Sequence, residues 1–145
     1  MVNYGDCIVF LLAKAYQHAH FQLKKHLLPY GLTPVQYLVL EAISREEGLS
    51  ATEIGRKVSL DSATLSGILD RLTERHWIIK ELDPLDRRSL RLYPGEQAKA
   101  SQEEMVGVRE RSNAEILEDF SIEERVLLKR LLKDLSRQVL ADRSI

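Results

Sequence analysis

Apolar residues recur at helical spacing along most of this chain, and the pattern changes to alternation only near its middle. Residues 7–26 place one stripe of apolar and small positions along a helix. That stripe contains Ile8, Leu11, Leu12, Ala15, Ala19 and Gln22. Pro29 and Gly31 end this first helix. A second helix is predicted to begin at Pro34, because a proline at the first helical position loses no hydrogen bond, and to end near Gly48.

Two shorter helices follow in close succession. The segment from Ser50 to Glu53 has the form of a capping box and predicts a helix that reaches about Lys57. Asp61 is placed to cap the next helix, which extends to about His76. The buried face of that helix contains Leu65, Ile68, Leu69 and Leu72. Two helices joined by a short turn are typical of a helix-turn-helix.

The alternating pattern occupies residues 77–82 and 90–93, which we interpret as two short strands. Between them, residues 83–89 form a hairpin tip with Pro84 in a turn position. The remainder is helical again. We expect one helix over about 96–120 and a last one, opened by the Ser121–Glu124 capping box, to about Ala141. The fold class is therefore mainly α (α+β).

Composition narrows the class of protein. The chain has 145 residues, 44% of them hydrophobic, and a single cysteine, which suits one globular domain or two small lobes without a disulfide scaffold. It contains neither an apolar run of membrane-spanning length nor a signal-peptide pattern, so we expect a cytoplasmic protein with no membrane partner. Residues 56–99 carry a net charge of +2 within a total of −1, which points to a modest polyanion-binding surface in the middle of the chain.

The exposed face of the fourth predicted helix is built from small and polar side chains. We predict that DNA contacts come from Ser62, Ala63, Thr64, Ser66, Gly67 and Arg71. Small side chains let a helix lie deep in a major groove, where hydroxyls reach phosphates or base edges and an arginine reaches a guanine. A solvated amphipathic helix is the other interpretation of this segment taken alone.

The hairpin tip favours the first interpretation. Arg87 and Arg88 are adjacent in an exposed turn, and Asp86 is near enough to orient one guanidinium. A short hairpin that carries arginine suits a minor groove, whose negative potential attracts it. A solvated turn with weak ion pairs is the alternative. Helix-turn-helix, hairpin and basic tip in this order indicate a winged helix-turn-helix that binds DNA.

Residues from about 7 to 140 resemble the multiple-antibiotic-resistance-regulator (MarR) family of bacterial transcription factors. Three segments carry the resemblance. They are Gly31-Leu-Thr-Pro-Val-Gln-Tyr37, Leu60-Asp-Ser-Ala-Thr-Leu-Ser-Gly-Ile-Leu-Asp-Arg-Leu72, and Asp83-Pro-Leu-Asp-Arg-Arg88 followed by Leu90-x-Leu92. The resemblance implies a single MarR-like domain over 1–145, with a winged helix-turn-helix lobe at 31–95 and helices at 1–30 and 96–145 that form a dimerisation domain.

The resemblance also implies how such a protein works. A homodimer would place one recognition helix in each major groove and one wing arginine in each flanking minor groove. By position, Arg88 matches the family's minor-groove arginine and Asp86 the acid that holds it. Two positions depart from the family pattern. Tyr93 replaces a usual threonine, so we expect the next helix to start late or to fray, and His76 replaces a frequent glycine at a left-handed position.

The last helix carries an apolar seam that is broader than a small lobe could cover. The seam contains Leu127, Leu128, Leu131, Leu132, Leu135, Val139 and Leu140. An interlocked homodimer would bury it, and two-fold symmetry then predicts a palindromic operator with half-sites about 10 bp apart. The alternative is a monomer in which the first and last helices pack against each other.

Family members often release DNA when a phenol or an aromatic carboxylate binds between the dimer base and the winged lobe. The residues that we assign to such an effector are His18, Gln22 and Tyr37, whose polar groups could meet a carboxylate or hydroxyl in an apolar cleft. An interface histidine and a core tyrosine are the plainer interpretations. The leading hypothesis is thus a ligand-responsive, dimeric repressor.

Other functions remain as alternatives. A redox-sensing repressor would use Cys7, but this residue falls two positions before the sensing cysteine of one branch of the family, about 200° around a helix. A winged-helix module that binds proteins is suggested by the acidic Asp70 and Glu74 on the recognition face. Scattered histidines, with none on the fifth predicted helix, argue against zinc, and we expect no metal or other cofactor. No nucleophile elbow or phosphate loop supports an enzyme.

Overall fold

A computed structural model describes residues 4–142 and the side chains of residues 4–137. Its helices are η1 (Tyr4–Asp6), α1 (Ile8–Leu27), η2 (Leu28–Tyr30), α2 (Pro34–Arg45), α3 (Ala51–Val58), α4 (Ser62–Glu74), α5 (Glu96–Ala100), α6 (Gln102–Ile116) and α7 (Ile122–Asp142). Its strands are β1 (Leu49–Ser50), β2 (Ile78–Leu82) and β3 (Leu90–Pro94). The mainly helical fold with a small sheet confirms the predicted fold class.

Side-chain caps fix where the helices begin. The Thr33 hydroxyl accepts the Gln36 N–H while the Gln36 side chain accepts the Thr33 N–H, so α2 starts at Pro34 as predicted. The predicted capping boxes that open α3 and α7 are also present. Each box satisfies N–H groups that a helix start leaves without partners.

The end of α4 sets the direction of the hairpin. His76 has a left-handed backbone with φ 63°, as its position predicted. Its N–H donates to the Thr73 carbonyl at 3.1 Å, and the Trp77 N–H donates to the Leu72 carbonyl at 2.9 Å. These two bonds form a Schellman motif, in which apolar residues at both ends pack together. Trp77 and Leu72 are accordingly both in the core, and β2 starts immediately after them.

The sheet has the order β1-β3-β2, with β3 antiparallel to both neighbours. Strand β1 was not predicted, because a strand of two residues is too short to show an alternating pattern. Buried residues of the sheet and of helices α1 to α6 share one core. Its largest fully buried members are Trp77, Leu27, Ile43, Ile54, Leu72, Ile78 and Leu92.

The C-terminal part of the chain differs from the prediction in two respects. The expected single helix over 96–120 is interrupted at Ser101, a buried residue with φ −105° and ψ 16°, and it ends at Ile116. No proline or glycine at Ser101 signals this break in the sequence. Helix α5 begins at Glu96 without a side-chain cap, and the His76 carbonyl accepts the Gln97 N–H at 3.0 Å instead.

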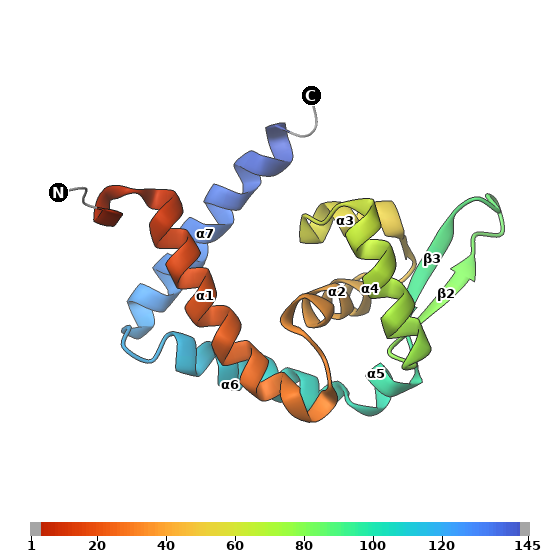
Figure 1. Cartoon of the computed structure of the whole chain (residues 1–145), viewed down its shortest axis with the longest axis horizontal. Coiled ribbons are helices and arrows are strands. Elements are labelled where there is room, and N and C mark those ends of the chain that lie inside the picture. The colour runs from red at the N-terminus through yellow and green to blue at the C-terminus, as the bar shows by residue number, and fades with distance from the viewer. Residues whose placement is uncertain (1–3, 143–145) are drawn as a thin grey trace.

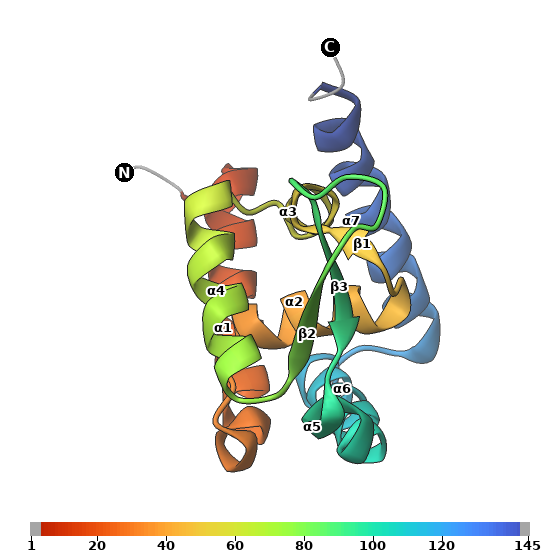
Figure 2. The same cartoon turned by 90° about the vertical axis from the view of Figure 1, so that its right-hand side faces the viewer.

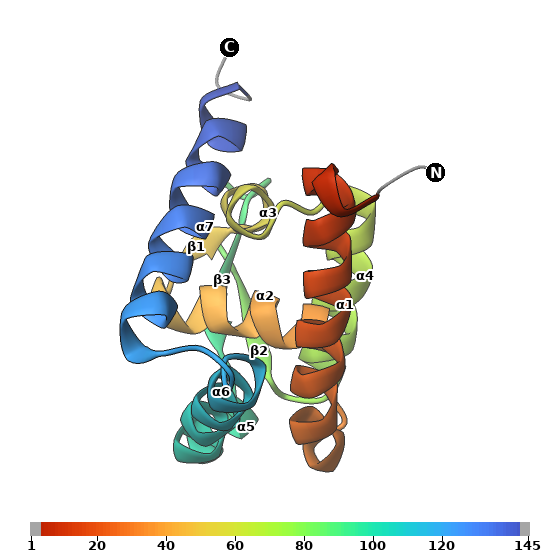
Figure 3. The ribbon, with the colours of Figure 1, turned by 90° about the vertical axis from the view of Figure 1, so that its left-hand side faces the viewer.

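Two parts of the chain are separated in space. Figure 1 shows α2, α3, α4 and the β2–β3 hairpin gathered in one lobe, while α1 and α6 cross below and beside it. Helix α1 packs against α6. Figures 2 and 3 show that α7 stands apart from α1, although the two cross in the first view. Within residues 4–142, α1 and α7 therefore do not form the extensive contact that the monomer alternative requires.

Helix α7 exposes much of its predicted apolar seam. The exposed fractions of Leu127, Leu131, Leu132 and Leu135 lie between 42% and 48%. Val139 and Leu140, the last predicted members, lie outside the described side chains. None of the helices within residues 4–142 is both long enough and apolar enough to cross a membrane.

Candidate nucleic-acid interface

The predicted recognition face is assembled on α4. Leu65, Leu69 and Leu72 are buried on one side of this helix. The predicted contact residues are all exposed on the remainder of it, namely Ser62, Ala63, Thr64, Ser66, Gly67 and Arg71. Because none of these side chains is larger than threonine except Arg71, the backbone of α4 is accessible to a large, closely fitting partner.

Asp61 determines how the face begins. Its carboxylate accepts the Thr64 N–H at 2.8 Å and the Thr64 hydroxyl at 2.9 Å. These hydrogen bonds, the one from the Thr64 backbone above all, hold the pKa of Asp61 below its ordinary value. The Thr64 hydroxyl is thus engaged in the cap, and Ser62 and Ser66 are the hydroxyls of the face that make no hydrogen bond within the described part of the chain.

The middle of the face is open and nearly neutral. A Cβ atom at Gly67 would have no atom within 4 Å apart from its chain neighbours and the nearby backbone of its own helix, so no packing contact requires a glycine there. One turn further, the Asp70 carboxylate accepts a hydrogen bond of 2.6 Å from the Lys80 ammonium of β2. This pair neutralises an acidic side chain that favoured the protein-binding alternative.

Asp83 organises the tip of the β2–β3 hairpin, which we call the wing. The Asp83 carboxylate accepts the Leu85 N–H at 2.9 Å and pairs with the Arg91 guanidinium at 3.2 Å. These contacts, led by the Leu85 hydrogen bond, keep the pKa of Asp83 below its ordinary value. Backbone bonds from Asp86 to Asp83 and from Ser89 to Asp86 close two successive turns. The wing tip is therefore a defined loop.

The role predicted for Asp86 is corrected by this geometry. Its carboxylate accepts the backbone N–H of Arg88 at 3.0 Å and does not hold the Arg88 guanidinium. An aspartate two residues before the N–H that it accepts forms an Asx turn, which the short tip favours. Arg87 and Arg88 are exposed, and among residues 4–142 neither guanidinium has an ion-pair partner.

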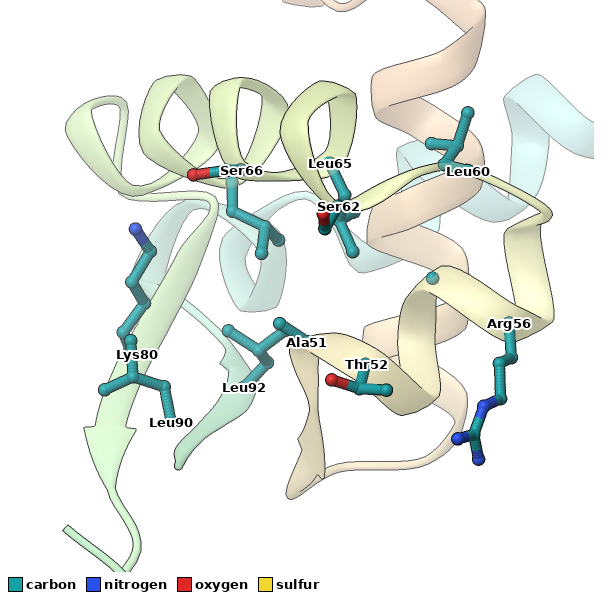
Figure 4. A pocket seen from close by; sticks show the side chains of 12 residues that line it. Ala51, Thr52, Arg56, Leu60, Ser62, Leu65, Ser66, Lys80, Leu90 and Leu92 are labelled. Carbon is teal, nitrogen blue, oxygen red and sulfur yellow. The ribbon is translucent and has the colours of Figure 1, made fainter. Parts of the chain in front are cut away.

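A cavity of about 340 Å³ lies between α3, α4 and the sheet. Leu65, Leu69, Leu90 and Leu92 supply apolar lining. Figure 4 shows polar side chains around the same hollow, from Thr52 and Arg56 of α3, Ser62 and Ser66 of α4, and Lys80 of β2. The sequence did not single out Thr52, Arg56 or Lys80, because only the fold brings α3 and β2 beside α4.

Arg75 connects the end of α4 to the junction between α1 and α2. Its guanidinium donates to the carbonyls of Tyr30 and Gly31. Gly31 has φ 63°, and a Cβ there would come within 2.6 Å of the Arg75 guanidinium. A residue with a side chain at position 31 would therefore be strained and would displace this contact.

A second cavity, of about 450 Å³, lies between α1, α2 and α6. Of the three residues assigned to an effector from the sequence, Tyr37 lines this cavity and His18 and Gln22 do not. The α1 residues that face it are Tyr16, Ala19, His20 and Leu23. This set follows the i, i+3, i+4, i+7 spacing of one helix face. His18 lies two residues after Tyr16, and Gln22 two residues after His20, so each is turned by about 200° from the lining residue before it.

Charged and unpaired polar groups surround this second cavity. Arg109 of α6 pairs with Glu41 of α2 at 3.0 Å, and Arg45 also lines the space. The Ser112 hydroxyl is buried and has no hydrogen-bond partner within the described residues. The Tyr37 hydroxyl donates to the Met105 carbonyl at 3.3 Å, and burial, followed by the nearby Glu41, raises its pKa to about 12. Tyr37 is therefore neutral at physiological pH.

Cys7 is exposed at the start of α1, where it makes no side-chain cap. The described part of the chain contains no group of three or more His, Cys, Asp or Glu side chains placed to hold a metal ion.

Comparison with known proteins agrees with this arrangement. The model of the MarR family matches residues 30–89, which span α2 through the wing. The HTH-type transcriptional regulator SarZ of Staphylococcus aureus is 31% identical over 100 residues, which cover 69% of this chain and 65% of the relative. The match thus spans just under two thirds of that curated protein.

Solved structures agree over nearly the whole chain. A probable transcriptional regulator from Pseudomonas aeruginosa superimposes with a TM-score of 0.84 at 28% identity, covering 92% of this chain and 99% of that one. BpsR of Bordetella bronchiseptica, whose DNA binding is regulated by 6-hydroxynicotinic acid, has a TM-score of 0.84 at 26% identity, covering 94% of this chain and 97% of its own.

Proposed function

Because this chain belongs to the MarR family, we propose that it is a transcriptional repressor that binds a palindromic DNA operator as a homodimer. The family and the homologues are transcriptional regulators and not enzymes. The observation that carries the proposal is the pairing of a small-residue helix face with a basic wing. The N-terminal half of α4 and the wing tip lie at the same end of the lobe in two perpendicular views (Figures 1 and 2).

On this proposal each lobe makes three kinds of contact. Ser62, Ser66 and Arg71 of α4 reach the major groove, and Arg88 of the wing reaches the flanking minor groove. The cavity between α4 and the sheet then faces the sugar–phosphate backbone that separates the two grooves. Its hydroxyl, guanidinium and ammonium groups are donors that suit phosphate oxygens.

The dimer that we propose uses the α7 seam together with the exposed start of α1. Ile8 and Val9 are 61% and 71% exposed, and Leu131 and Leu135 of α7 are nearly half exposed. Monomeric proteins rarely leave contiguous apolar surfaces of this kind in water. A two-fold related copy would cover both helices and set the spacing of two recognition helices. In this assignment residues 31–95 are the DNA-binding lobe, and residues 1–30 and 96–145 form the dimer base.

We expect Arg88→Ala to weaken operator binding and to lower the salt dependence of binding by about one unit per half-site, since each wing arginine displaces counterions from the phosphates. The measurement is a titration of labelled operator at several salt concentrations. Lys99→Ala, which removes an exposed charge on α5, is the matched control. Equal slopes for wild type and Arg88→Ala would refute the assignment of the wing.

We further propose that the cavity between α1, α2 and α6 binds an aromatic carboxylate or phenol that releases the operator. The regulation of BpsR by 6-hydroxynicotinic acid supports this class of ligand. Within the cavity, the Arg45 guanidinium can meet a carboxylate, while Tyr16 and Leu23 provide apolar lining. The buried, unpartnered Ser112 hydroxyl can meet a ring substituent.

The effector proposal predicts that Arg45→Ala raises the concentration of 6-hydroxynicotinate or a related acid needed for release by roughly tenfold, the effect of losing one charge-assisted hydrogen bond. Operator affinity without ligand should stay unchanged. The assay is fluorescence anisotropy of bound operator during ligand titration, with Lys57→Ala as a control outside the cavity. Release that is unaffected by Arg45→Ala would show that the ligand binds elsewhere.

A further inference from the structure

Leu85 is the most exposed large hydrophobic residue in the described part of the chain. Its exposed fraction is 94%, and it stands at the tip of the wing beside Pro84. Leu90 and Leu82, lower in the same hairpin, are 38% and 62% exposed. The leucine at the end of the wing is thus the most exposed of the three, in a turn whose other exposed residues include Asp86, Arg87 and Arg88 and where an apolar side chain is unusual.

The loop holds Leu85 in this position. The Leu85 N–H donates to the Asp83 carboxylate at 2.9 Å, and the Ser89 carbonyl accepts the Asp83 N–H at 3.0 Å. Pro84 restricts the backbone immediately before the leucine. Because these contacts use backbone and carboxylate groups only, the Leu85 side chain takes no part in stabilising the loop. A defined loop that presents an apolar side chain to solvent is prepared to contact a partner.

The charges around Leu85 select the kind of partner. Arg87 and Arg88 follow it within three residues, and no carboxylate in the described residues pairs with either. The two acids of the tip are already engaged, Asp83 by the Leu85 N–H and Arg91, and Asp86 by the Arg88 N–H. An apolar tip flanked by unpaired arginines complements a minor groove, which has negative walls and accepts apolar wedges between base pairs.

We propose that Leu85 is a minor-groove wedge that inserts between two adjacent base pairs beneath the wing, unstacks them and bends the operator. This inference rests on the proposed function, because it requires that the wing lies on DNA. If Leu85 acts in this way, the protein prefers certain base-pair steps beneath the wing without forming a hydrogen bond to any base there. Pyrimidine–purine steps such as TA unstack easily and A-tracts are stiff, so the wedge selects the former.

The test compares two operators that differ only at the step beneath the wing, TA in one and AA within an A-tract in the other. Wild type should prefer the TA operator by about tenfold, the usual effect of one unfavourable base pair. Leu85→Ala should reduce this preference to about twofold or less through weaker binding to the TA operator. Leu82→Ala, which removes the same atoms from an exposed leucine outside the tip, should leave the preference unchanged.

A second readout reports the insertion directly. 2-Aminopurine in place of the adenine at the TA step should brighten when wild type binds, because its fluorescence rises on unstacking, and it should stay dim with Leu85→Ala. End-to-end energy transfer across the same operator should show a bend with wild type and Leu82→Ala that Leu85→Ala reduces.

The outcomes separate this inference from the proposed function. If wild type binds the operator selectively but Leu85→Ala shows the same preference, fluorescence and bend, the wedge is refuted and the DNA-binding function stands. If wild type binds no operator selectively and Arg88→Ala changes nothing, the proposed function itself fails.

Discussion

Replacing Gly67 by glutamate is expected to abolish operator binding without weakening the fold. Gly67 lies inside α4 with nothing within 4 Å of its added Cβ, so the larger side chain extends into solvent in the free protein. On the proposed operator, the same carboxylate would meet phosphates and base edges at close range. Like charges brought together at an interface cost several kcal/mol, so we expect affinity to fall by at least about a hundredfold.

The same substitution should maintain or raise the stability of the fold although it weakens DNA binding. Glycine is a poor residue inside a helix, and glutamate is better by about half a kcal/mol. The new carboxylate also lies four residues before Arg71, a favourable spacing for an ion pair on a helix. Urea unfolding followed by Trp77 fluorescence should therefore give a midpoint equal to or above that of wild type.

Gly67→Ala is the matched control. It gains helix propensity without charge and adds only a methyl group, so it should stabilise the protein by about 1 kcal/mol and weaken binding far less than Gly67→Glu. Equal operator affinity for wild type and Gly67→Glu would show that this face of α4 does not contact DNA.

The second large effect concerns the α7 seam. Leu131→Glu combined with Leu135→Glu should convert the dimer to a monomer, because it places charges on two side chains that are 48% and 44% exposed in one chain and would be buried between two. A monomer engages one half-site at a time. Without the second chain bound to the other half-site, affinity for the palindrome should fall by about a hundredfold or more.

Light scattering during gel filtration measures the mass of the protein in solution. Titration of the palindrome and of a single half-site measures how much affinity is gained when both half-sites are bound together. Lys133→Glu is the control, since it makes the same change in net charge on the opposite side of α7. The lobe core does not include α7, so Trp77 fluorescence should report a folded lobe in both variants. A double variant that stays dimeric would place the dimer contact elsewhere.

The sequence predicts those features of the structure that are formed by residues close together along the chain. The caps at Thr33, Ser50, Asp61 and Ser121 are formed by residues three positions apart, so motif and structure coincide. His76 likewise adopts the left-handed backbone that its place after α4 requires. Features that depend on packing were missed. The helix breaks at Ser101, which is buried in the folded chain, and no local breaker in the sequence marks that position.

The candidate sites divide in the same way. The exposed face of α4 follows from the positions of its leucines, and the structure leaves that face uncovered. The cavity residues Arg45, Arg109 and Ser112 come from two helices far apart in sequence, and their proximity depends on how α2 meets α6. His20, and not the predicted His18, lines the proposed effector cavity, because one helix pattern cannot show which of its faces a distant helix will cover. The Asp86 carboxylate binds the Arg88 backbone N–H and not the expected guanidinium, because turn geometry decides which group a carboxylate reaches.

Selection of binding sites from random-sequence DNA by the purified protein tests the central claim most directly. The account predicts enrichment of a palindrome whose half-sites lie about 10 bp apart, bound by two chains per duplex and lost with Gly67→Glu. Selected pools without a shared sequence, or a single unpaired half-site bound by one chain, would contradict it.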